Sequence, residues 1–338
     1  MCRILYALNQ PNIKSKINSF LLQSTDEPKA VDGHGFAGFD PTTRKWRVKK
    51  SSKPAPGSES KIANTFAEYP LVIGHLRNAQ IVDVPKSIID GLLSASPKNT
   101  HPFYHKNHVF MHNGRFDDAH LPSMRQWFHA NILPEYWQHV KGNTDSECVF
   151  YLLLSTIKRR EWIYKDIDML EGEGCILPTR FQRNLSSASL VKSSYSGLEE
   201  EGILRFSLRR PDGSSPENPL TPPASRPELF AKYPSKSEEL RDAVRECFQL
   251  LDSKFHLYIA NFIYADKDYS IVGRLEKNAT AQGKLVDSLY MATPSQRKNN
   301  QLLFTTEPLD KTQKYELVNW GTIFVINNET AEYNKYRI

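Results

Sequence analysis

The chain begins with the eight residues MCRILYAL, numbered Met1 to Leu8. The apolar run that starts after Cys2 has the length and composition of a buried β-strand. Apolar residues then recur at helical spacing, at Ile13, Ile17, Phe20 and Leu21. A buried strand followed at once by an amphipathic helix predicts that the start of the chain feeds directly into the hydrophobic core.

Short apolar or alternating runs elsewhere predict further strands. They lie at Gly33 to Asp40, Lys45 to Lys50, Leu71 to Leu76, His108 to Met111, Leu257 to Tyr264, Ser270 to Val272, Gln301 to Thr305 and Gly321 to Asn327. We expect His112-Asn113-Gly114 to form a turn, because Asn and Gly both tolerate positive φ. Helical periodicity predicts two more helices, from Asp145 to Ile157 and from Ser235 to Leu251.

The composition limits the class of protein. A chain of 338 residues with 39% hydrophobic content can bury a sizeable core. Its net charge of +6 comes from 44 basic and 38 acidic residues without a basic stripe interleaved with aromatic residues, so we expect no nucleic-acid partner. No apolar run approaches the roughly 20 residues of a membrane helix, and the first residues do not resemble a secretion signal. We therefore expect a cytoplasmic protein that makes no membrane contact.

Four cysteines are scattered along the chain, at Cys2, Cys148, Cys175 and Cys247. No two of them form a C-x-x-C pair, and no histidine lies near them at the spacing of a metal site. This pattern argues against a disulfide framework and against a zinc site, and it fits a reducing cytosol. We expect neither a metal ion nor another cofactor.

A Ser-rich and then Pro-rich stretch runs from about residue 184 to residue 234 and lacks apolar periodicity. Such a composition cannot bury enough apolar surface to offset the entropy of ordering the chain. We expect a disordered insertion there that is cleaved first in limited proteolysis, and not a domain boundary.

Cys2 carries chemistry of its own once Met1 is removed, which methionine aminopeptidase does when the second residue is small. Removal leaves a thiol and a free α-amine on one residue. The α-amine has an ordinary pKa of about 7.7 to 8.0, so at neutral pH a useful fraction can take the thiol proton, directly or through a water. A cysteine at a strand start is more often a small apolar residue, so the assignment depends on its companions.

Five motifs follow Cys2 along the chain. They are GHGFAGFD at 33–40, GHLR at 74–77, NTHPF at 99–103, FMHNG at 110–114 and TDSE at 144–147. Together with Cys2, this set resembles the class II glutamine amidotransferases through about residue 155. The stand-alone branch, which includes bacterial amidotransferase-like hydrolases and the fungal glutathione-degradation subunit, is the most similar, chiefly through NTHPF, FMHNG and TDSEC.

The resemblance implies the fold. It predicts an α+β protein with the N-terminal nucleophile hydrolase architecture, in which two stacked antiparallel sheets lie between helical layers in a four-layer αββα sandwich. One domain is expected to span residues 1–338, with Cys2 at the mature N-terminus and the insertion at 184–234.

The resemblance also implies residue roles. Cys2 is the nucleophile, and the Asn113 side chain with the Gly114 backbone N–H forms the oxyanion hole, whose donors stabilise the charge that develops on an attacked carbonyl. Arg77 and Asp145 match the substrate-binding positions, where a cation and an anion suit the α-carboxylate and α-ammonium of a γ-glutamyl group.

His75 and His101 match residues that support the pocket. A relay of Cys2, His101 and Asp145, as in papain-like proteases, is the competing assignment. We favour the supporting role because a nucleophile that has its own α-amine needs no imidazole.

The predicted function is hydrolysis of a γ-glutamyl amide, in glutathione or a related compound, through a thioester on Cys2. The resemblance suggests a partner subunit, either metallopeptidase-like or a synthase. The alternatives are a glutaminase subunit that supplies ammonia to a separate synthase and a non-catalytic regulatory subunit. Asn78, Ala79, Gln80 and Ile81 depart from the synthase-feeding relatives, which often have hydroxyl or imidazole groups there, so free glutamine is the less favoured substrate.

Overall fold

The computed structural model describes residues 2–24, 32–55, 57, 59–77, 96–115, 121–172, 234–255, 259–276, 288–292 and 300–338. The chain divides into two compact units, one of Met1–Glu161 with Lys236–Ile338 and one of Trp162–Ser235. The structure describes only the two ends of the second unit, so the fold below is that of the first. The predicted insertion lies outside the described residues apart from its last residue, Pro234.

The first sheet has the strand order β11-β9-β10-β1-β4-β2-β3, with every neighbouring pair antiparallel. Its strands are β1 (Arg3–Leu8), β2 (His34–Asp40), β3 (Lys45–Ser51), β4 (Leu71–Leu76), β9 (Tyr290–Ala292), β10 (Leu302–Thr305) and β11 (Tyr315–Leu317). β1 is central and buried along its whole length. β3 is an edge strand whose exposed lysines discourage pairing with another chain.

The second sheet has the order β13-β12-β8-β7-β6-β5 and is also antiparallel throughout. Its strands are β5 (Phe103–His105), β6 (His108–Arg115), β7 (Ile259–Ala265), β8 (Tyr269–Glu276), β12 (Thr322–Asn327) and β13 (Tyr333–Arg337). The sheet therefore combines strands from before and after the Trp162–Ser235 unit.

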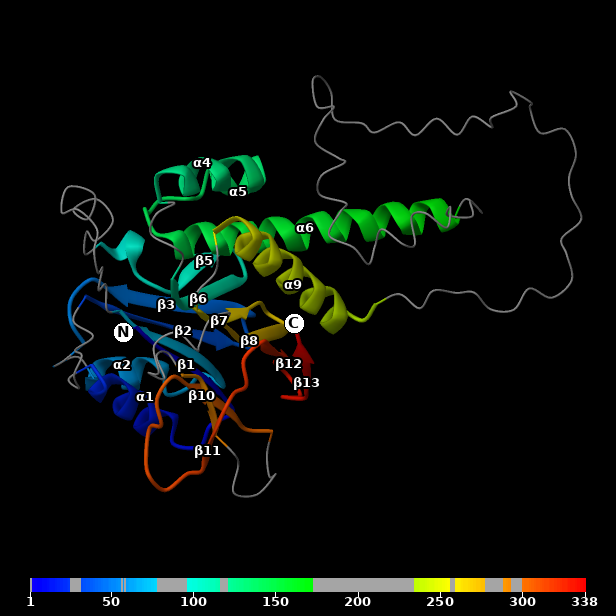
Figure 1. The fold of residues 1–338 in the computed structure, drawn as a ribbon. Helices are drawn as coiled ribbons and strands as arrows, with labels where there is room; N and C mark the ends of the chain where they lie inside the picture. The colour runs from blue at the N-terminus through cyan, green and yellow to red at the C-terminus, as the bar shows by residue number, and fades with distance from the viewer. Residues whose placement is uncertain are drawn as a thin grey trace, which may run out of the picture. The chain divides into compact units, whose positions relative to one another are not determined.

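Helices cover the outer faces of the two sheets (Figure 1). They are α1 (Ile13–Leu22), α2 (Glu59–Phe66), α4 (Leu121–Asn131), α5 (Pro134–Trp137), α6 (Asp145–Gly172) and α9 (Lys236–Phe255), with a short 3₁₀ turn, η1 (Pro97–Asn99). α1 and α2 pack on the first sheet, and α4, α9 and the buried start of α6 pack on the second.

Three apolar clusters define the layers. Leu5 and Ala7 of β1 pack against α1 and α2, whereas Ile4 and Tyr6 lie in the layer between the sheets. Such alternation is the two-residue period of a strand that is buried on both faces. The predicted four-layer αββα sandwich is confirmed.

The strand and helix predictions hold with shifted boundaries, and one prediction is wrong. His112-Asn113-Gly114 does not form a turn, because β6 continues to Arg115 and pairs Asn113 with Asn261 and Gly114 with Ala260. A partner strand almost 150 residues away in sequence outweighs the local preference of Asn-Gly for a turn. α6 is longer than predicted and extends to Gly172.

No helix in the described ranges is long and apolar enough to cross a membrane.

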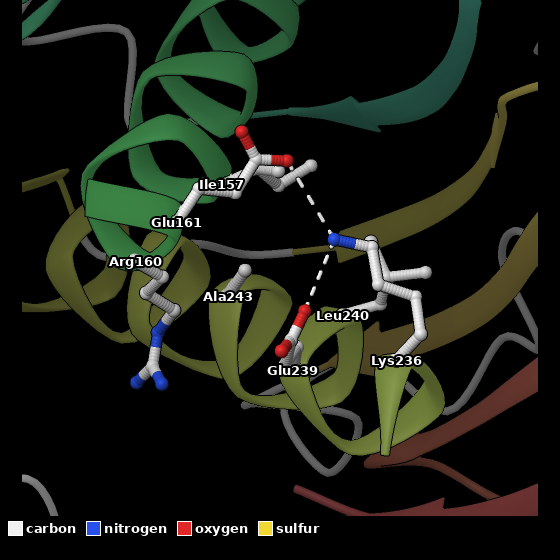
Figure 2. Close-up of a pocket in the computed structure, with 7 residues that line it drawn as sticks. All are labelled: Ile157, Arg160, Glu161, Lys236, Glu239, Leu240 and Ala243. Atoms are coloured by element: carbon white, nitrogen blue, oxygen red, sulfur yellow. Dashed lines mark hydrogen bonds and ion pairs between the residues drawn. The ribbon is translucent and has the colours of Figure 1, made fainter. Parts of the chain in front are cut away.

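The residues on either side of the Trp162–Ser235 unit, Glu161 and Lys236, contact one another within the first unit (Figure 2). Lys236 at the start of α9 contacts Glu161 of α6 at 3.6 Å and Glu239 at 3.0 Å. Close by, Arg160 contacts Glu246 at 2.9 Å. These side chains are partly exposed, so each ion pair contributes little stability. Their value here is geometric, because they show that residues 161 and 236 are close neighbours.

This proximity predicts that the fold tolerates removal of the second unit. Replacing residues 163–234 by a Gly/Ser linker of about six residues, which spans up to about 20 Å, leaves the apolar clusters intact. We expect the melting temperature to change by less than about 3 °C, measured by thermal denaturation monitored by circular dichroism. Loss of cooperative unfolding in the shortened protein would show that the second unit is part of the folded core.

Candidate active site

Cys2 lies immediately before β1, the central strand of the first sheet. β1 pairs with β4 so that Arg3 lies opposite Leu76 and Ile4 opposite His75. The next step of this register places Cys2 opposite Arg77. Cys2 is partly exposed and Arg77 is buried. The predicted nucleophile and the predicted carboxylate-binding arginine therefore lie on neighbouring strand ends.

The layer between the two sheets becomes polar at the end where β1 begins. On β1, Ile4 and Tyr6 face the second sheet, so Cys2 continues the same face. On β6, Met111 faces the first sheet, and Asn113 continues that face. The Asn113 side-chain Nδ2 donates a hydrogen bond of 2.9 Å to the backbone carbonyl oxygen of Cys2. Two predicted site residues from different sheets are in direct contact.

The segment after β10 braces the start of β1. The Ile4 N–H donates to the Thr306 hydroxyl at 3.2 Å, and the Thr306 N–H donates to the Ile4 carbonyl oxygen at 3.2 Å. The buried Arg3 guanidinium pairs with Glu307 at 3.0 Å. Arg3 and Ile4, the two residues that follow Cys2, are thus fixed by Thr306 and Glu307.

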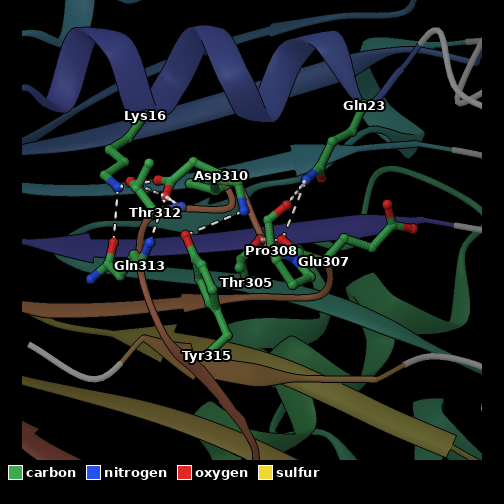
Figure 3. Close-up of polar contacts among 10 residues, drawn as sticks. Lys16, Gln23, Thr305, Glu307, Pro308, Asp310, Thr312, Gln313 and Tyr315 are labelled. Carbon is green, nitrogen blue, oxygen red and sulfur yellow. Dashed lines mark hydrogen bonds and ion pairs between the residues drawn. The ribbon is translucent and has the colours of Figure 1, made fainter.

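Helix α1 holds the same segment in place (Figure 3). Gln23 Nε2 donates to the carbonyl oxygens of Glu307 and Pro308, each at 3.3 Å. Lys16 Nζ contacts Asp310 at 2.7 Å, and its ammonium holds the pKa of that carboxyl well below the usual range. The helix that follows β1 therefore stabilises the loop against which β1 begins.

Arg77 and Asp145 are each fixed by neighbouring groups. The Arg77 N–H donates to the Gly33 carbonyl oxygen at 2.8 Å, and its Nη1 donates to the Asp32 carbonyl oxygen at 3.4 Å. Asp145 is the first residue of α6, and its Oδ1 accepts from the Ser146 N–H at 2.7 Å. Burial raises the pKa of Asp145, and the hydrogen bonds that its carboxylate accepts from Ser146 oppose the rise. In the described part of the chain the two opposite charges are held apart rather than paired.

Ser146 links the start of α6 to β6. Its hydroxyl contacts His112 Nδ1 at 3.1 Å and donates to Asp145 Oδ1 at 3.3 Å. His112 directly precedes Asn113, so Asp145 and Asn113 are connected through two buried polar residues. The motifs FMHNG and TDSE are therefore brought together by the fold.

The loop before α6 is fixed by Glu147. Its carboxylate accepts from the N–H groups of Lys141 at 3.1 Å and Gly142 at 2.6 Å. Asn99 Oδ1 accepts from the Asn143 N–H at 2.9 Å, and a Cβ at Gly142 would lie only 2.5 Å from the same oxygen. This close approach requires glycine and joins the NTHPF segment to the helix that carries Asp145.

His75 and His101 are buried, and their ring centroids lie 4.1 Å apart with the ring planes tilted by 36°. Burial, assisted by the nearby Arg77 charge, lowers the pKa of His75 to about 3, and burial lowers the pKa of His101 well below its usual range. Burial also lowers the pKa of His112 to about 4. All three imidazoles are neutral at neutral pH.

The competing relay needs a hydrogen bond between His101 and Asp145. Neither ring nitrogen of His101 has a hydrogen-bond partner within the described residues. His101 instead packs against β2, where a Cβ at Gly35 would lie 1.9 Å from the His101 carbonyl oxygen. This contact supports the structural role for His101.

Several site-forming residues were not predicted. Lys50 Nζ donates to the carbonyl oxygens of Thr100 and Pro102, at 2.9 and 3.3 Å, and so anchors the NTHPF segment. In sequence it was only the last residue of the strand predicted from Lys45 to Lys50. Asn261 and Arg274, which lie opposite one another on β7 and β8, gave no signal at all.

No group of three or more His, Cys, Asp or Glu side chains in the described ranges is placed to hold a metal ion.

An αββα sandwich with a cysteine before its central strand is the arrangement of an N-terminal nucleophile amidohydrolase. Residues 1–172, slightly more than half of the 338-residue chain, match the profile of the family described as glutamine amidotransferases class-II. The chain belongs to the class-II glutamine amidotransferases.

The chain is also similar to Probable glutamine amidotransferase DUG3 from Saccharomyces cerevisiae. The two are 28% identical over 167 residues, which cover 46% of this chain and 43% of that protein. The match thus spans less than half of the curated relative.

Two solved structures share the fold. A glutamine aminotransferase class-II domain protein from Silicibacter pomeroyi has a TM-score of 0.51 at 15% identity, covering 100% of this chain and 99% of that one. Glutamine phosphoribosylpyrophosphate amidotransferase from B. subtilis has a TM-score of 0.51 at 12% identity, covering 100% of this chain and 49% of that one. At these identities the likeness shows the fold alone.

The buried histidines predict a loss of stability in mild acid. Their folded pKa values lie below the ordinary 6.5, so below pH 6.5 the unfolded chain binds more protons than the folded one. Stability is therefore present above pH 6.5 and is lost as the pH falls. Near pH 6 we expect unfolding to take up about two protons from these three residues, or roughly 3 kcal/mol per pH unit.

Urea unfolding between pH 7.5 and pH 6.0 measures this slope. His75→Asn should reduce the slope by about 1 kcal/mol per pH unit, the contribution of one neutral buried histidine near pH 6, whereas the same change at the exposed His129 should not alter it. A slope that is insensitive to His75→Asn would contradict the assignment of a neutral buried imidazole.

Proposed function

We propose that the protein hydrolyses a γ-glutamyl amide bond, with Cys2 as the nucleophile. The observation that carries this proposal is the 2.9 Å hydrogen bond from Asn113 Nδ2 to the Cys2 carbonyl oxygen, because it places an amide donor beside the nucleophilic residue. An amide NH₂ has two hydrogens, so the bond to Cys2 leaves a second one for the oxyanion of an attacked carbonyl.

The proposed reaction has two halves. With Met1 removed, the Cys2 α-amine takes the thiol proton, and the sulfur attacks the substrate carbonyl carbon. The oxyanion collapses to a γ-glutamyl thioester as the leaving amine takes the proton back. Water, deprotonated by the same α-amine, then attacks the thioester and releases glutamate. The neutral histidines take no part in proton transfer.

Gly114 is the second proposed oxyanion donor. β5 pairs only with His108–Phe110 of β6, so beyond Phe110 this side of β6 has no partner among the described strands. A backbone N–H on that side can therefore serve a substrate. Two hydrogen-bond donors, one from a side chain and one from the backbone, can together stabilise the oxyanion of a tetrahedral intermediate.

Arg77 and Asp145 give the γ-glutamyl preference. A planar guanidinium can bind the α-carboxylate through two parallel hydrogen bonds, and the carboxylate of Asp145 can accept from the α-ammonium. Both charges are held by their surroundings without being paired to one another in the described residues. A zwitterionic α-carbon is the ligand that would satisfy both.

Glutathione or a related γ-glutamyl compound is the proposed substrate, supported by the resemblance of NTHPF, FMHNG and TDSEC to the stand-alone branch. Glutamine is the second candidate, and the family match itself favours it. The residues that depart from the synthase-feeding relatives, Asn78 to Ile81, lie outside the described residues.

A cytoplasmic location and a partner subunit complete the proposal. Among the described residues Cys2, Cys148 and Cys247 form no disulfide, which suits a reducing compartment, and a nucleophilic thiol must stay reduced to act. The partner, metallopeptidase-like or a synthase, rests on the sequence resemblance. Assaying glutamate release from glutathione and from glutamine, with and without a candidate partner, tests substrate and partner together.

Substitution of the reaction centre predicts separate effects on turnover and binding. Cys2→Ala should abolish hydrolysis, and Asn113→Ala should lower kcat about a hundredfold or more with little change in KM, as expected of a group that acts on the transition state. Steady-state kinetics on glutathione and glutamine measures both. Asn107→Ala, on the exposed turn before β6, is the control and should retain full activity. An active Cys2→Ala variant would remove the basis of the proposal, as would a mass spectrum showing that Met1 is retained.

A substrate series tests Arg77 and Asp145. Arg77→Lys keeps the charge but loses the planar fork. The transition-state stabilisation of γ-glutamyl compounds, obtained from kcat/KM, should therefore fall by about 1.5 to 3 kcal/mol. Asp145→Asn should discriminate less than the parent against analogues that lack the α-ammonium. Arg44→Lys and Asp268→Asn, which alter an exposed ion pair, are matched controls. Equal rates for complete and truncated substrates in the parent enzyme would show that the pocket is assigned wrongly.

A further inference from the structure

The hydroxyl of Ser146 lies between two other polar groups of the site. It is 3.1 Å from His112 Nδ1 on β6 and 3.3 Å from Asp145 Oδ1 on α6. The Ser146 N–H donates to the same Asp145 oxygen at 2.7 Å. Ser146 and His112 are buried, whereas Asp145 is partly exposed, so a ligand can reach its carboxylate. The three residues form a chain of contacts that runs from the interior to the proposed ammonium site.

The Ser146 hydroxyl has only one proton for its two neighbours, although its oxygen can also accept. An ionised carboxylate only accepts, so the contact with Asp145 is a hydrogen bond only if the hydroxyl proton points to Oδ1. His112 Nδ1 must then carry a proton and donate it to the Ser146 oxygen. The opposite arrangement, in which the hydroxyl donates to His112, would leave two acceptor oxygens 3.3 Å apart without a proton between them.

The His112 ring can adopt the required form. Burial lowers the pKa of His112 to about 4, so at neutral pH the ring is uncharged and carries one proton, on Nδ1 or on Nε2. A hydrogen bond to a carboxylate is stronger than one to a neutral group, which favours the arrangement that directs the hydroxyl proton to Asp145. The contacts of Ser146 therefore select the Nδ1–H form of His112.

The other charged groups near the start of α6 leave the Asp145 charge to these hydrogen bonds. Glu147 is acidic too, and its carboxylate accepts from two backbone N–H groups of the preceding loop. Cys148 is a neutral thiol, because burial raises its pKa to about 12, and the charge of Arg125 on α4 acts on Glu147 and Cys148. Burial raises the pKa of Asp145 as well, and the hydrogen bonds from Ser146 oppose the rise. The N-terminal end of α6 also favours a negative charge.

We propose that Ser146 is a positioning residue of the ammonium site: held by the Nδ1–H of His112, its hydroxyl donates to Asp145 and keeps this carboxylate oriented and ionised for a substrate α-ammonium. Both bonds from Ser146 reach Oδ1, so they leave the second carboxylate oxygen, Oδ2, to other donors. The inference deepens the proposed function and rests on it for its kinetic readout.

Steady-state kinetics of Ser146→Ala measures the effect of the hydroxyl. Asp145 is proposed to bind the α-ammonium in the ground state and in the transition state alike. KM for glutathione or glutamine should therefore rise about tenfold while kcat stays within about twofold. Ser146→Thr keeps a hydroxyl and should hold KM within about threefold of the parent value. Ser155→Ala is the matched control, because Ser155 is a buried serine of α6 bonded to Tyr151 and Leu133, and it should leave both constants unchanged.

A double-mutant cycle shows whether the effect passes through Asp145. In the Asp145→Asn background, Ser146→Ala should change KM by less than about threefold. An equal rise in KM with and without Asp145, a loss confined to kcat, or no change in KM at all would overturn the proposal. A Ser146→Thr variant as weak as Ser146→Ala would also overturn it, because the hydroxyl would then not be the group that matters.

A measurement without substrate separates this proposal from the proposed function. ¹⁵N NMR of the histidine rings, with the His112 signals assigned by their loss in His112→Gln, shows which ring nitrogen carries the proton. At neutral pH the parent should have the Nδ1–H form of His112, and Ser146→Ala should populate the Nε2–H form. If the parent hydrolyses neither glutathione nor glutamine, the proposed function fails and this measurement still decides the arrangement: an Nε2–H ring in the parent would overturn the role of Ser146.

Discussion

The hydrogen bond between Asn113 and the Cys2 carbonyl oxygen joins the two sheets at the end of the layer that they share. It is one contact, but it can form only if the two sheets stack at the correct spacing and with their strand ends level. The apolar side chains between the sheets set that spacing, and β1 is held in place on both sides, by β4 and by β10. The hydrophobic core and the proposed reaction centre are therefore two parts of one layer, and a change of strand register would destroy both.

The sequence indicated the candidate site residues more clearly than it indicated the strands and residues that surround them. The motif order singled out Cys2, Arg77 and Asp145 as candidate site residues. The structure places Arg77 on the strand end beside Cys2, and a short polar path leads from Asp145 to Asn113. Asn113-Gly114 was misread as a turn, because local propensity says nothing about a partner strand that follows after more than a hundred residues. The short strands β9, β11 and β13 were missed, since three to five residues carry too little periodic signal.

Burial sets the charge state of the site. Arg77 and Arg274 bring permanent positive charge into the buried layer, Lys50 adds an ammonium beside it whose pKa burial lowers, and neutral histidines lie near them. Protonating His75 or His101 would add another desolvated cation near Arg77, which is why burial and Arg77 both act to keep these rings neutral. An imidazole held in this way is a poor proton carrier at neutral pH. The proton chemistry is then left to the one group in the proposed mechanism whose ordinary pKa suits it, the α-amine of Cys2.

The two halves of the chain contribute differently. Residues 1–172, which match the family, contain all the motif residues. The second half supplies β7, β8, β10 and β12. With them come Thr306, which is hydrogen-bonded to Ile4 beside Cys2, and the strand β7, which pairs with the Asn113 segment of β6. A catalytic group is useful only when its orientation is fixed, and fixing it needs packed neighbours rather than particular motifs. This explains why the second half shows so little resemblance in sequence yet cannot be separated from the site: many different side chains can support the same few atoms, provided that the strands beneath them keep their register.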